Sequence, residues 1–549
     1  MLDTLDLNTI ADEHARQCIR LLLNLVDELT QENRTQREEL QRLRDEIQRL
    51  KGEQGQPTIK ANTSKPPAPD YSSEADRHPP RTRGKRGARA PIAVDRDEVL
   101  RVDPTTLPPD AEFKGYDEVI VQDLVLRTDN VRFHKEKFYS PAEGKTYLAE
   151  LPSGYHGEFG PGVRALALVC YFACQMTEPK LLAFFEQVGL QISAGEISNL
   201  VIKAHAPFHA EKDAVYAAGL RSSPWQHTDD TATRVNGQNQ HCHIVDNPLH
   251  TTYLTLPGKD RLSIIDVLRN GQPRRFRYNA DAETWLAAAG VSQVTRQKLA
   301  HLPRDQDLDE AALQLLLAQY VPGVGAQTRK WILDAMAVAA YHAQLEWPVV
   351  QLLICDDAPQ FTWITDELAG CWVHEGRHYK KLLPSVPLHQ QLLTTFLTDF
   401  WAFYAELLAY RQQPTPEARA RLETRFDELF ATETGYWALD ERIRRTRAKK
   451  ACLLLVLAHP EIRLHNNPAE LGARQRVRKR AISFGPRTAD GAKAWDTFQS
   501  LGATTRKLGV NFLQYLHDRI SGANQIPPLA EIIAERARAL ELGASWGTP

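Results

Sequence analysis

Three alternating segments decide the fold of this chain: WQHTDDTATRVNGQNQHCHIVDNPLHTTYLTLPG, from Trp225 to Gly258. Apolar and polar residues alternate through WQHTDDTATRVNG, QHCHIVDN and TTYLTLPG, which is the period of half-buried β-strands. Asn247-Pro248 is typical of a turn between the second and third segments. The pattern predicts three antiparallel strands, with Asp229 and Asp230 on the first.

A second strand signal follows in WPVVQLLICDDAP, residues 347–359. This short continuous apolar run ends in Asp356 and Asp357, as a buried central strand does when its carboxyl end faces a site. Successive side chains on a strand point to opposite faces, so only one aspartate of each pair, 229/230 and 356/357, can point into that site. The alternative for each is a turn or cap residue.

A single carboxylate, Glu470, lies at the head of LHNNPAELGARQRVRKRAISF, residues 464–484. Pro468 suits the first turn of a helix. The predicted helix then carries Arg474, Arg476, Arg478, Lys479 and Arg480. An acid followed by bases fits a site where the acid binds a divalent cation and the bases bind phosphates. The alternative is a solvated basic face with one incidental glutamate.

The order of these elements is the plan of an RNase H-like nuclease core. Carboxylates from strand ends and from a helix can hold two Mg²⁺ (or Mn²⁺) ions about 3.5–4 Å apart for phosphodiester chemistry. Mg²⁺ prefers oxygen ligands. The predicted catalytic and metal ligands are Asp229, Asp356 and Glu470.

The rest of the chain predicts a multidomain α/β protein. The expected parts are a coiled-coil dimerisation helix (1–50), a disordered basic linker (51–91), a small strand-rich module (92–155), a helical DNA-binding segment (156–220), the RNase H-like core (221–522) with helical insertions at about 282–345 and 383–460, and a helical tail (523–549). At 549 residues the chain is too long to fold around a single hydrophobic core, so several domains are expected.

The coiled-coil prediction rests on heptads across residues 12–50. One seam position holds Ile19, Val26, Asn33, Leu40 and Ile47, and the other holds Leu22, Leu29, Leu43 and Leu50, with Gln36 as its break. This pattern favours a parallel homodimer. The alternative is an amphipathic helix that packs on its own chain.

The linker contains RTRGKRGAR, residues 81–89. Its Arg83, Lys85 and Arg86 could follow a DNA groove as basic arms do, or the segment could be a solubilising linker. In the module after it, EVIVQDLVLRT and VRFHKEKFYSP alternate as strands do.

Three helices are then expected at about 161–176, 179–188 and 194–206. Ser193 and Glu196 form a capping box, and Gly189 gives a helix-turn-helix outline. Plain structural helices are the alternative to a DNA-reading unit.

Composition excludes little. Net charge is −2, so any nucleic-acid contact must come from local basic clusters. The seven cysteines form no CxxC pair, which argues against a zinc ribbon and fits a reducing compartment. No uninterrupted apolar stretch of about 18 residues is present, so a cytoplasmic protein without a membrane span is expected.

Several blocks resemble the insertion-sequence-sixty-six family of bacterial DDE transposases. HTDDTATRVNG is similar to its first motif, LLICDDAPQF to its second, CWVHEGRHYKKL to its C-x-x-H-x-R-R-x-F block, and LHNNPAELGARQRVRKRAISF to its final block. The resemblance spans nearly the whole chain. Departures are Asp230 for Glu, Asp357 for Gly, Gly376 for Arg, the insertion at 282–345, and no cysteine pair near 110–145, so zinc is not expected.

The resemblance implies an insertion-sequence transposase that binds terminal inverted repeats, cleaves 3′ ends and transfers strands into target DNA. It implies a dimer, with a larger oligomer on DNA and accessory proteins left open. Arg474, Arg478 and Lys479 would contact phosphates, with His374 and Arg377 near the second metal; the alternative for these last two is a packed, hydrogen-bonded pair. Rival functions are an RNase H-fold nuclease that does not join strands, and a transposase-derived DNA-binding protein without catalysis.

Overall fold

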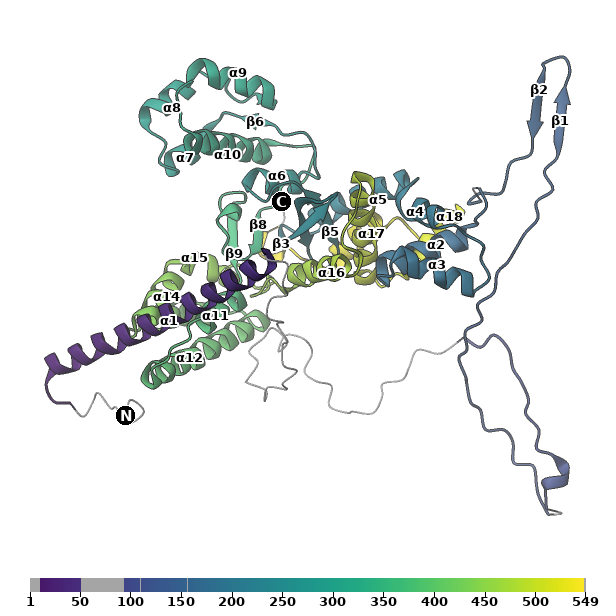
Figure 1. Cartoon of the computed structure of the whole chain (residues 1–549), viewed down its shortest axis with the longest axis horizontal. Helices are drawn as coiled ribbons and strands as arrows, with labels where there is room; N and C mark the ends of the chain where they lie inside the picture. Colours follow the sequence, from purple (N-terminus) through teal and green to yellow (C-terminus); the bar gives the residue numbers. More distant parts are fainter. Residues whose placement is uncertain (1–9, 51–92, 109, 156, 548–549) are drawn as a thin grey trace.

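The computed structural model of the chain describes residues 10–50, 93–108, 110–155 and 157–547 (Figure 1). The predicted basic arm with Arg83, Lys85 and Arg86, and the predicted linker at 51–91, lie outside these residues. No helix in the described part of the chain is long and apolar enough to cross a membrane.

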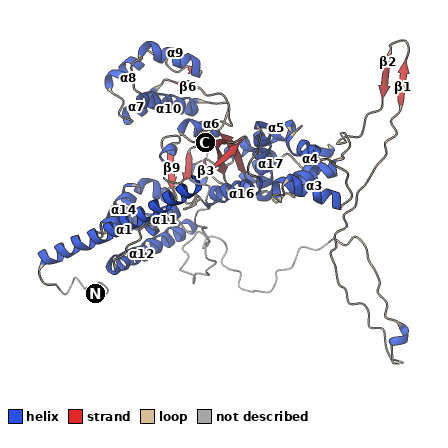
Figure 2. Ribbon diagram, in the orientation of Figure 1, coloured by secondary structure: helices blue, strands red, loops and turns tan. Residues whose placement is uncertain are grey.

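A mixed five-stranded sheet forms the centre of the molecule (Figure 2). Its order is β5-β4-β3-β8-β9. The bounds are β3 Trp225–Val235, β4 Gln238–Asp246, β5 Thr251–Leu256, β8 Leu352–Cys355 and β9 Glu367–Gly370. The first three strands are antiparallel, as the alternating sequence predicts, while β8 is parallel to β3 and β9 is parallel to β8.

Alternate residues of the strands pack on opposite faces of the sheet. On one face Ile244 and Tyr253 pack against Ala469 and Ala473 of α16 (Asn467–Ser483). On the other, Val245 and Leu353 join the core of the helices that follow β5. The two-residue period read from the sequence therefore sets which helices cover each face.

The first insertion forms a helical lobe beside the sheet, as predicted, with a short two-stranded ladder within it (Figure 1). Its elements are α6 Arg261–Leu268, β6 Phe276–Arg277, α7 Ala280–Ala288, α8 Gln293–Leu299, β7 Asp307–Leu308, α9 Glu310–Tyr320 and α10 Ala326–Ala343. Leu286, Leu317 and Ile332 are buried in its core.

The second helical region follows β9 and packs on Leu352 and Ile354 of β8. It comprises α11 Trp372–Lys380, α12 Pro387–Gln412, α13 Pro416–Leu429, α14 Trp437–Ala448, α15 Lys450–Leu453 and the short η7 Leu455–Leu457. Buried aromatic side chains dominate its core: Trp372, Phe396, Phe400, Phe403 and Phe426.

The helices before the sheet share one core with the helices at the end of the chain. The first group is α2 Pro161–Leu168, the π-helical η5 Val169–Ala173, α3 Glu178–Gln187, α4 Ala194–Ile202 and α5 Ala206–Arg221; the second is α17 Ala489–Lys507, α18 Phe512–Ser521 and α19 Leu529–Leu540. The short η8 Ala544–Trp546 follows them, and its Trp546 packs on the core of the second helical region. Ser193 accepts a hydrogen bond from the Glu196 N–H at 3.1 Å, as the capping motif predicts, and Gly189 has φ +84°.

Residues 93–155 differ from the packed module that the pattern predicts. The described part holds the short 3₁₀ helix η4 (Pro104–Thr106) and one hairpin, β1 (Lys137–Ser140) with β2 (Lys145–Leu148). Apolar side chains across 118–128 are exposed, Val119 by 78% and Val121 by 81%. The alternation is present, but no surface among the described residues covers it.

Helix α1 (Glu13–Leu50) satisfies both readings of its heptads. Leu23, Asn24 and Asp27 are buried on the body of the same chain. Asn24 donates to the Gly435 carbonyl at 2.9 Å, and Asp27 accepts from the Ser385 N–H at 2.7 Å. The seam residues Leu22, Leu29, Leu40, Leu43 and Leu50 are exposed. A long helix with a free apolar seam fits a coiled coil.

Candidate active site

Two of the predicted carboxylates follow the parallel ladder between β3 and β8. In this ladder Trp225 pairs with Leu352, and the last pair is His227 with Ile354. Asp229 comes two residues after His227, within β3, and Asp356 comes two residues after Ile354, directly after β8 ends at Cys355. Both aspartates therefore follow the point where the parallel pairing ends, at the carboxyl end of β8, the edge where α/β sheets carry their sites.

The start of α16 brings the third carboxylate to this edge. Asn466, just before the helix, donates from its side-chain amide to the Thr228 carbonyl at 2.7 Å. Its amide oxygen lies 3.1 Å from His227 Nδ1. Since Thr228 immediately precedes Asp229, these bonds fix the head of the helix beside that aspartate, and Glu470 N–H donates back to Asn466 at 3.1 Å.

Asp229 interacts electrostatically with the other two carboxylates. Burial, with the negative charges of Glu470 and Asp356 adding to it, raises the pKa of Asp229 to about 7, against a partly compensating hydrogen bond from the Asp230 N–H at 2.8 Å. A buried carboxylate crowded by like charges favours a bound cation. An all-oxygen donor set fits Mg²⁺ or Mn²⁺.

Arg377 of α11 holds Glu470 in place. Its two terminal nitrogens donate to the two carboxylate oxygens, each at 3.1 Å. Such paired hydrogen bonds fix the plane of a carboxylate. Arg474, one turn further along α16, lies 3.9 Å from the same group. The prediction that Arg377 belongs to the site therefore agrees with its position.

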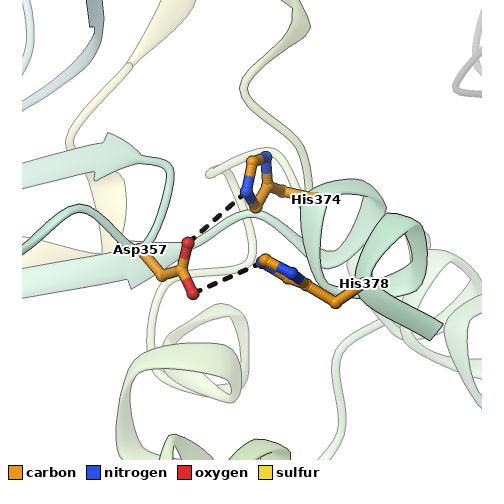
Figure 3. Close-up of side chains that lie close together, drawn as sticks. All are labelled: Asp357, His374 and His378. Carbon is orange, nitrogen blue, oxygen red and sulfur yellow. Dashed lines mark ion pairs between the residues drawn. The ribbon is translucent and has the colours of Figure 1, made fainter. Parts of the chain in front are cut away.

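The neighbouring aspartates point elsewhere. Asp230 faces His241 at 3.7 Å and Lys259 at 3.9 Å. Asp357 faces His374 at 3.4 Å and His378 at 3.5 Å (Figure 3). It also lies 2.6 Å from Lys449. The strand alternation that the sequence predicts thus separates each pair.

His374 belongs to the cluster around Asp357 and not to the three carboxylates. Burial lowers the pKa of His374, against the opposing charge of Asp357. Burial works to raise the pKa of Asp357, but the hydrogen bond and the charge of Lys449 outweigh it and lower that pKa to about 2. His374 and Asp357 therefore form a charged cluster next to Asp356.

The basic residues of α16 divide into exposed and buried sets. Arg474 and Arg478 are exposed. Arg476 is 1% exposed and pairs with Asp496. Lys479 is fully buried, where it donates to the Tyr171 carbonyl at 2.6 Å and lies 3.4 Å from the centre of the Tyr171 ring. A lysine enclosed in this way cannot reach a phosphate in this conformation, so the prediction of a DNA contact for Lys479 does not fit its position.

Cys371 and Gly376 have structural roles that sequence reasoning missed and that only the folded chain reveals. The Cys371 sulfur accepts from the N–H groups of His374 and Asn466, both at 3.3 Å, and so joins α11 to α16. A side chain at Gly376 would lie within 2.6 Å of Trp401, which explains glycine at that position. The H-x-x-x-H spacing of His374 and His378 is readable but stands out only once Asp357 is seen beside it.

The fold and site define a class of protein: an α/β enzyme core with acidic side chains gathered at the carboxyl edge of a mixed sheet. A model described as "Transposase IS66 family" matches residues 352–494, from β8 into α17. The chain belongs to the IS66 family of transposases.

A curated relative is described as "Uncharacterized protein y4jO", from Sinorhizobium fredii. It is 32% identical over 330 residues, which cover 58% of this chain and 99% of the relative. No solved structure matches significantly.

Proposed function

We propose that this transposase binds the terminal inverted repeats of an insertion sequence and carries out 3′-end cleavage and strand transfer through Asp229, Asp356 and Glu470. The observation that supports the proposal is the parallel ladder of β3 and β8, whose last pair lies two residues before both Asp229 and Asp356. The sheet order, with three antiparallel strands followed by two parallel to β3, supports an RNase H-like core.

The three carboxylates would hold Mg²⁺ or Mn²⁺, two ions per site. When bound, such ions lower the pKa of an attacking water or 3′-hydroxyl and stabilise the leaving oxygen. Asn466 positions the head of α16 beside β3, and Arg377 orients the Glu470 carboxylate. Their combined effect is to fix the ligand geometry before DNA enters.

The DNA contacts would begin next to the carboxylates. Glu470, Arg474 and Arg478 are spaced by four residues and therefore lie on one face of α16. Both arginines are exposed, so DNA seated on the acids would place phosphates within their reach. His374 and Arg377 border the same edge from α11. Arg83, Lys85 and Arg86 would extend the contact along the duplex.

A homodimer through residues 12–50 would bring two cores to two DNA ends. The exposed seam of α1 supports this assembly, because five leucines on one stripe otherwise face water. Larger assemblies on DNA and accessory transposition proteins would add to this dimer.

The test is metal-dependent cleavage of a labelled duplex bearing the element's own terminal repeat, with Glu470→Gln as the variant. That substitution keeps the shape of the side chain and removes the ligand charge. We expect native protein to nick at the repeat end and to join the freed 3′ end to target DNA, while Glu470→Gln binds equally and does not cut.

Three other outcomes are informative. Cleavage without joining would indicate a nuclease. Binding without cleavage by both proteins would indicate a DNA-binding protein that lacks catalysis. Equal cleavage by both would show that Glu470 is not a ligand. Glu433→Gln, a change on the helical region away from the sheet edge, is the matched control.

A further inference from the structure

We infer that Asp357, His374 and His378 form a binding site for a transition-metal ion of the zinc type, separate from the three carboxylates. One ligand atom from each residue lies within 4.8 Å of the other two. Figure 3 shows the two imidazoles of α11 facing the two oxygens of the single carboxylate. The proposed function places His374 at the DNA-facing edge but gives no role to Asp357 or His378.

The three side chains are close enough to share one ion after rotation. Asp357 Oδ1 lies 3.4 Å from His374 Nε2, and the other oxygen, Oδ2, lies 3.5 Å from His378 Nε2. Ligands about 2.0–2.1 Å from a tetrahedral ion are separated from each other by about 3.3 Å. Because the ligand atoms lie within 4.8 Å of one another, rotation of the carboxylate and the imidazoles would bring one carboxylate oxygen and both rings around an ion, with a fourth position left for water.

The donor set selects the kind of ion. Two imidazoles and one carboxylate favour Zn²⁺ and its first-row neighbours, whereas Mg²⁺ prefers oxygen ligands alone. The histidines lie four residues apart on one helix, a spacing that puts both rings on one face and occurs in zinc-binding helices. His378 Nε2 is buried and has no hydrogen-bond partner among the described residues, so it is available as a ligand.

The surroundings already contain the second layer of contacts that metal sites use. Lys449 Nζ lies 2.6 Å from Asp357 Oδ2. If one oxygen of the Asp357 carboxylate bound the ion, the other would stay on Lys449. Lys449 would then orient the carboxylate, which is the usual role of an outer-sphere partner. Lys449 also donates to Glu375 at 3.0 Å, which fixes its own position.

Glu375 follows His374, so the stretch reads H-E-G-R-H, but this is not a peptidase site. Glu375 is 2% exposed and is bound by Arg442, by Thr446 Oγ1 at 2.6 Å and by Lys449. A glutamate with these partners cannot act as a base toward metal-bound water. The ion would instead join the end of β8 to α11, the helix that carries Arg377.

The expectation that zinc is absent came from the missing cysteines near 110–145. The present site uses other residues in another part of the chain and is independent of that module. Its ligands Asp357 and His378 were not among the residues that sequence reasoning selected.

The test measures zinc bound by tag-free protein, purified with zinc in the buffer, desalted and assayed for metal content. We expect about one equivalent in the native protein. His378→Ala and Asp357→Asn should each weaken binding by more than the 10–100-fold typical of an outer-sphere change. The absorption spectrum of bound Co²⁺ gives a second readout. We expect a four-coordinate signature in the native protein and its loss in the two cluster variants.

Two controls locate the ion. His517→Ala removes an exposed histidine on α18, and Asp229→Asn removes a proposed ligand of the three-carboxylate site. Both variants should still bind about one equivalent of zinc. Melting curves in chelator verify that each variant folds. If His378→Ala does not fold, Asp357→Asn, which keeps the side-chain shape, tests the proposal by itself.

The proposal is overturned if native protein binds no zinc, if both cluster variants bind it as native protein does, or if Asp229→Asn alone loses it. DNA-end cleavage in Mg²⁺ with zinc chelated measures the transposition proposal separately, so failure of one does not imply failure of the other.

Discussion

Arg377 and Glu470, 93 positions apart in the chain, form two parallel hydrogen bonds of 3.1 Å between guanidinium and carboxylate. The pair joins α11 to α16 at the edge of the sheet. Because Arg377 fixes both oxygens, the third carboxylate of the site has one orientation before any cation or DNA arrives.

Replacing Arg377 should therefore lower the rate of cleavage. We expect Arg377→Met to reduce end cleavage by about 10–100-fold, the usual cost of losing a residue that orients a metal ligand. Arg377→Lys should be intermediate, since it keeps the charge without the paired geometry. Arg425→Met on α13 is the control. Cleavage at the native rate by Arg377→Met would contradict this role.

Asp229→Asn should make the metal-free protein more stable at neutral and alkaline pH. The raised pKa of Asp229, about 7, means that the native state keeps a proton that the unfolded chain loses above about pH 4. Native stability therefore falls as pH rises from about 4 to about 7, by at most about 4 kcal/mol at 1.36 kcal/mol per pKa unit.

The measurement is the melting temperature in chelator across that pH range. The difference between Asp229→Asn and native protein should be small near pH 4 and largest above pH 7. Asp305→Asn, an exposed change, should show no such trend. A constant offset across the range would contradict the raised pKa.

Asn466→Ala should both destabilise the protein and impair cleavage. It leaves the Thr228 carbonyl and His227 Nδ1 without their partner, and each unsatisfied buried group costs about 1–3 kcal/mol. Thermal melting and the cleavage rate are the readouts, and Asn239→Ala on the exposed end of β4 is the control. An unchanged melting temperature would show that other contacts hold the head of α16.

The salt dependence of DNA binding should distinguish exposed from buried bases on α16. Arg474→Ala and Arg478→Ala should each reduce the slope of log K against log salt by about 1, as loss of one phosphate contact does. Lys479→Met should leave the slope unchanged because Lys479 Nζ is buried on the Tyr171 carbonyl. A reduced slope for Lys479→Met would show that Lys479 does contact a DNA phosphate.

The seam of α1 should control the oligomeric state. Leu40→Glu combined with Leu43→Glu places charge on two exposed seam positions, and we expect the mass in solution to fall from dimer to monomer. The melting temperature of the body should not change, because neither leucine packs on it. Arg42→Glu, outside the seam, is the control; a dimer that survives the double change would place the interface elsewhere.

The local periodicities of the sequence predicted four strands of the central sheet and most helices. β3, β4 and β5 follow from alternation, and β8 from its apolar run. β9 was missed because Glu367–Gly370 is four residues long with no apolar alternation. The parallel pairing of β3 with β8, which brings Asp229 and Asp356 to the same end of their ladder, could not be read from the sequence, since strand order and register are set by packing between distant segments.

The burial of Lys479 shows the same limit. Its helix reads as uniformly basic, and the residues that enclose Lys479, Tyr171 and Trp495, come from η5 and α17. Only the assembled core distinguishes Lys479 from its exposed neighbour Arg478. The alternation at 118–128 misled in the other direction, because a strand pattern predicts burial only where a second surface is present.

The attachment of α1 through Asn24 and Asp27 has a mechanical consequence. Helix α1 spans 38 residues, about 57 Å at 1.5 Å per residue, and its buried polar contacts fix it to α12 and α14 by one part of its length. Two chains joined along the remaining seam would have their cores held at a set separation and rotation by a stiff rod. Adding one heptad to the seam would then change the spacing of paired DNA ends in a single step.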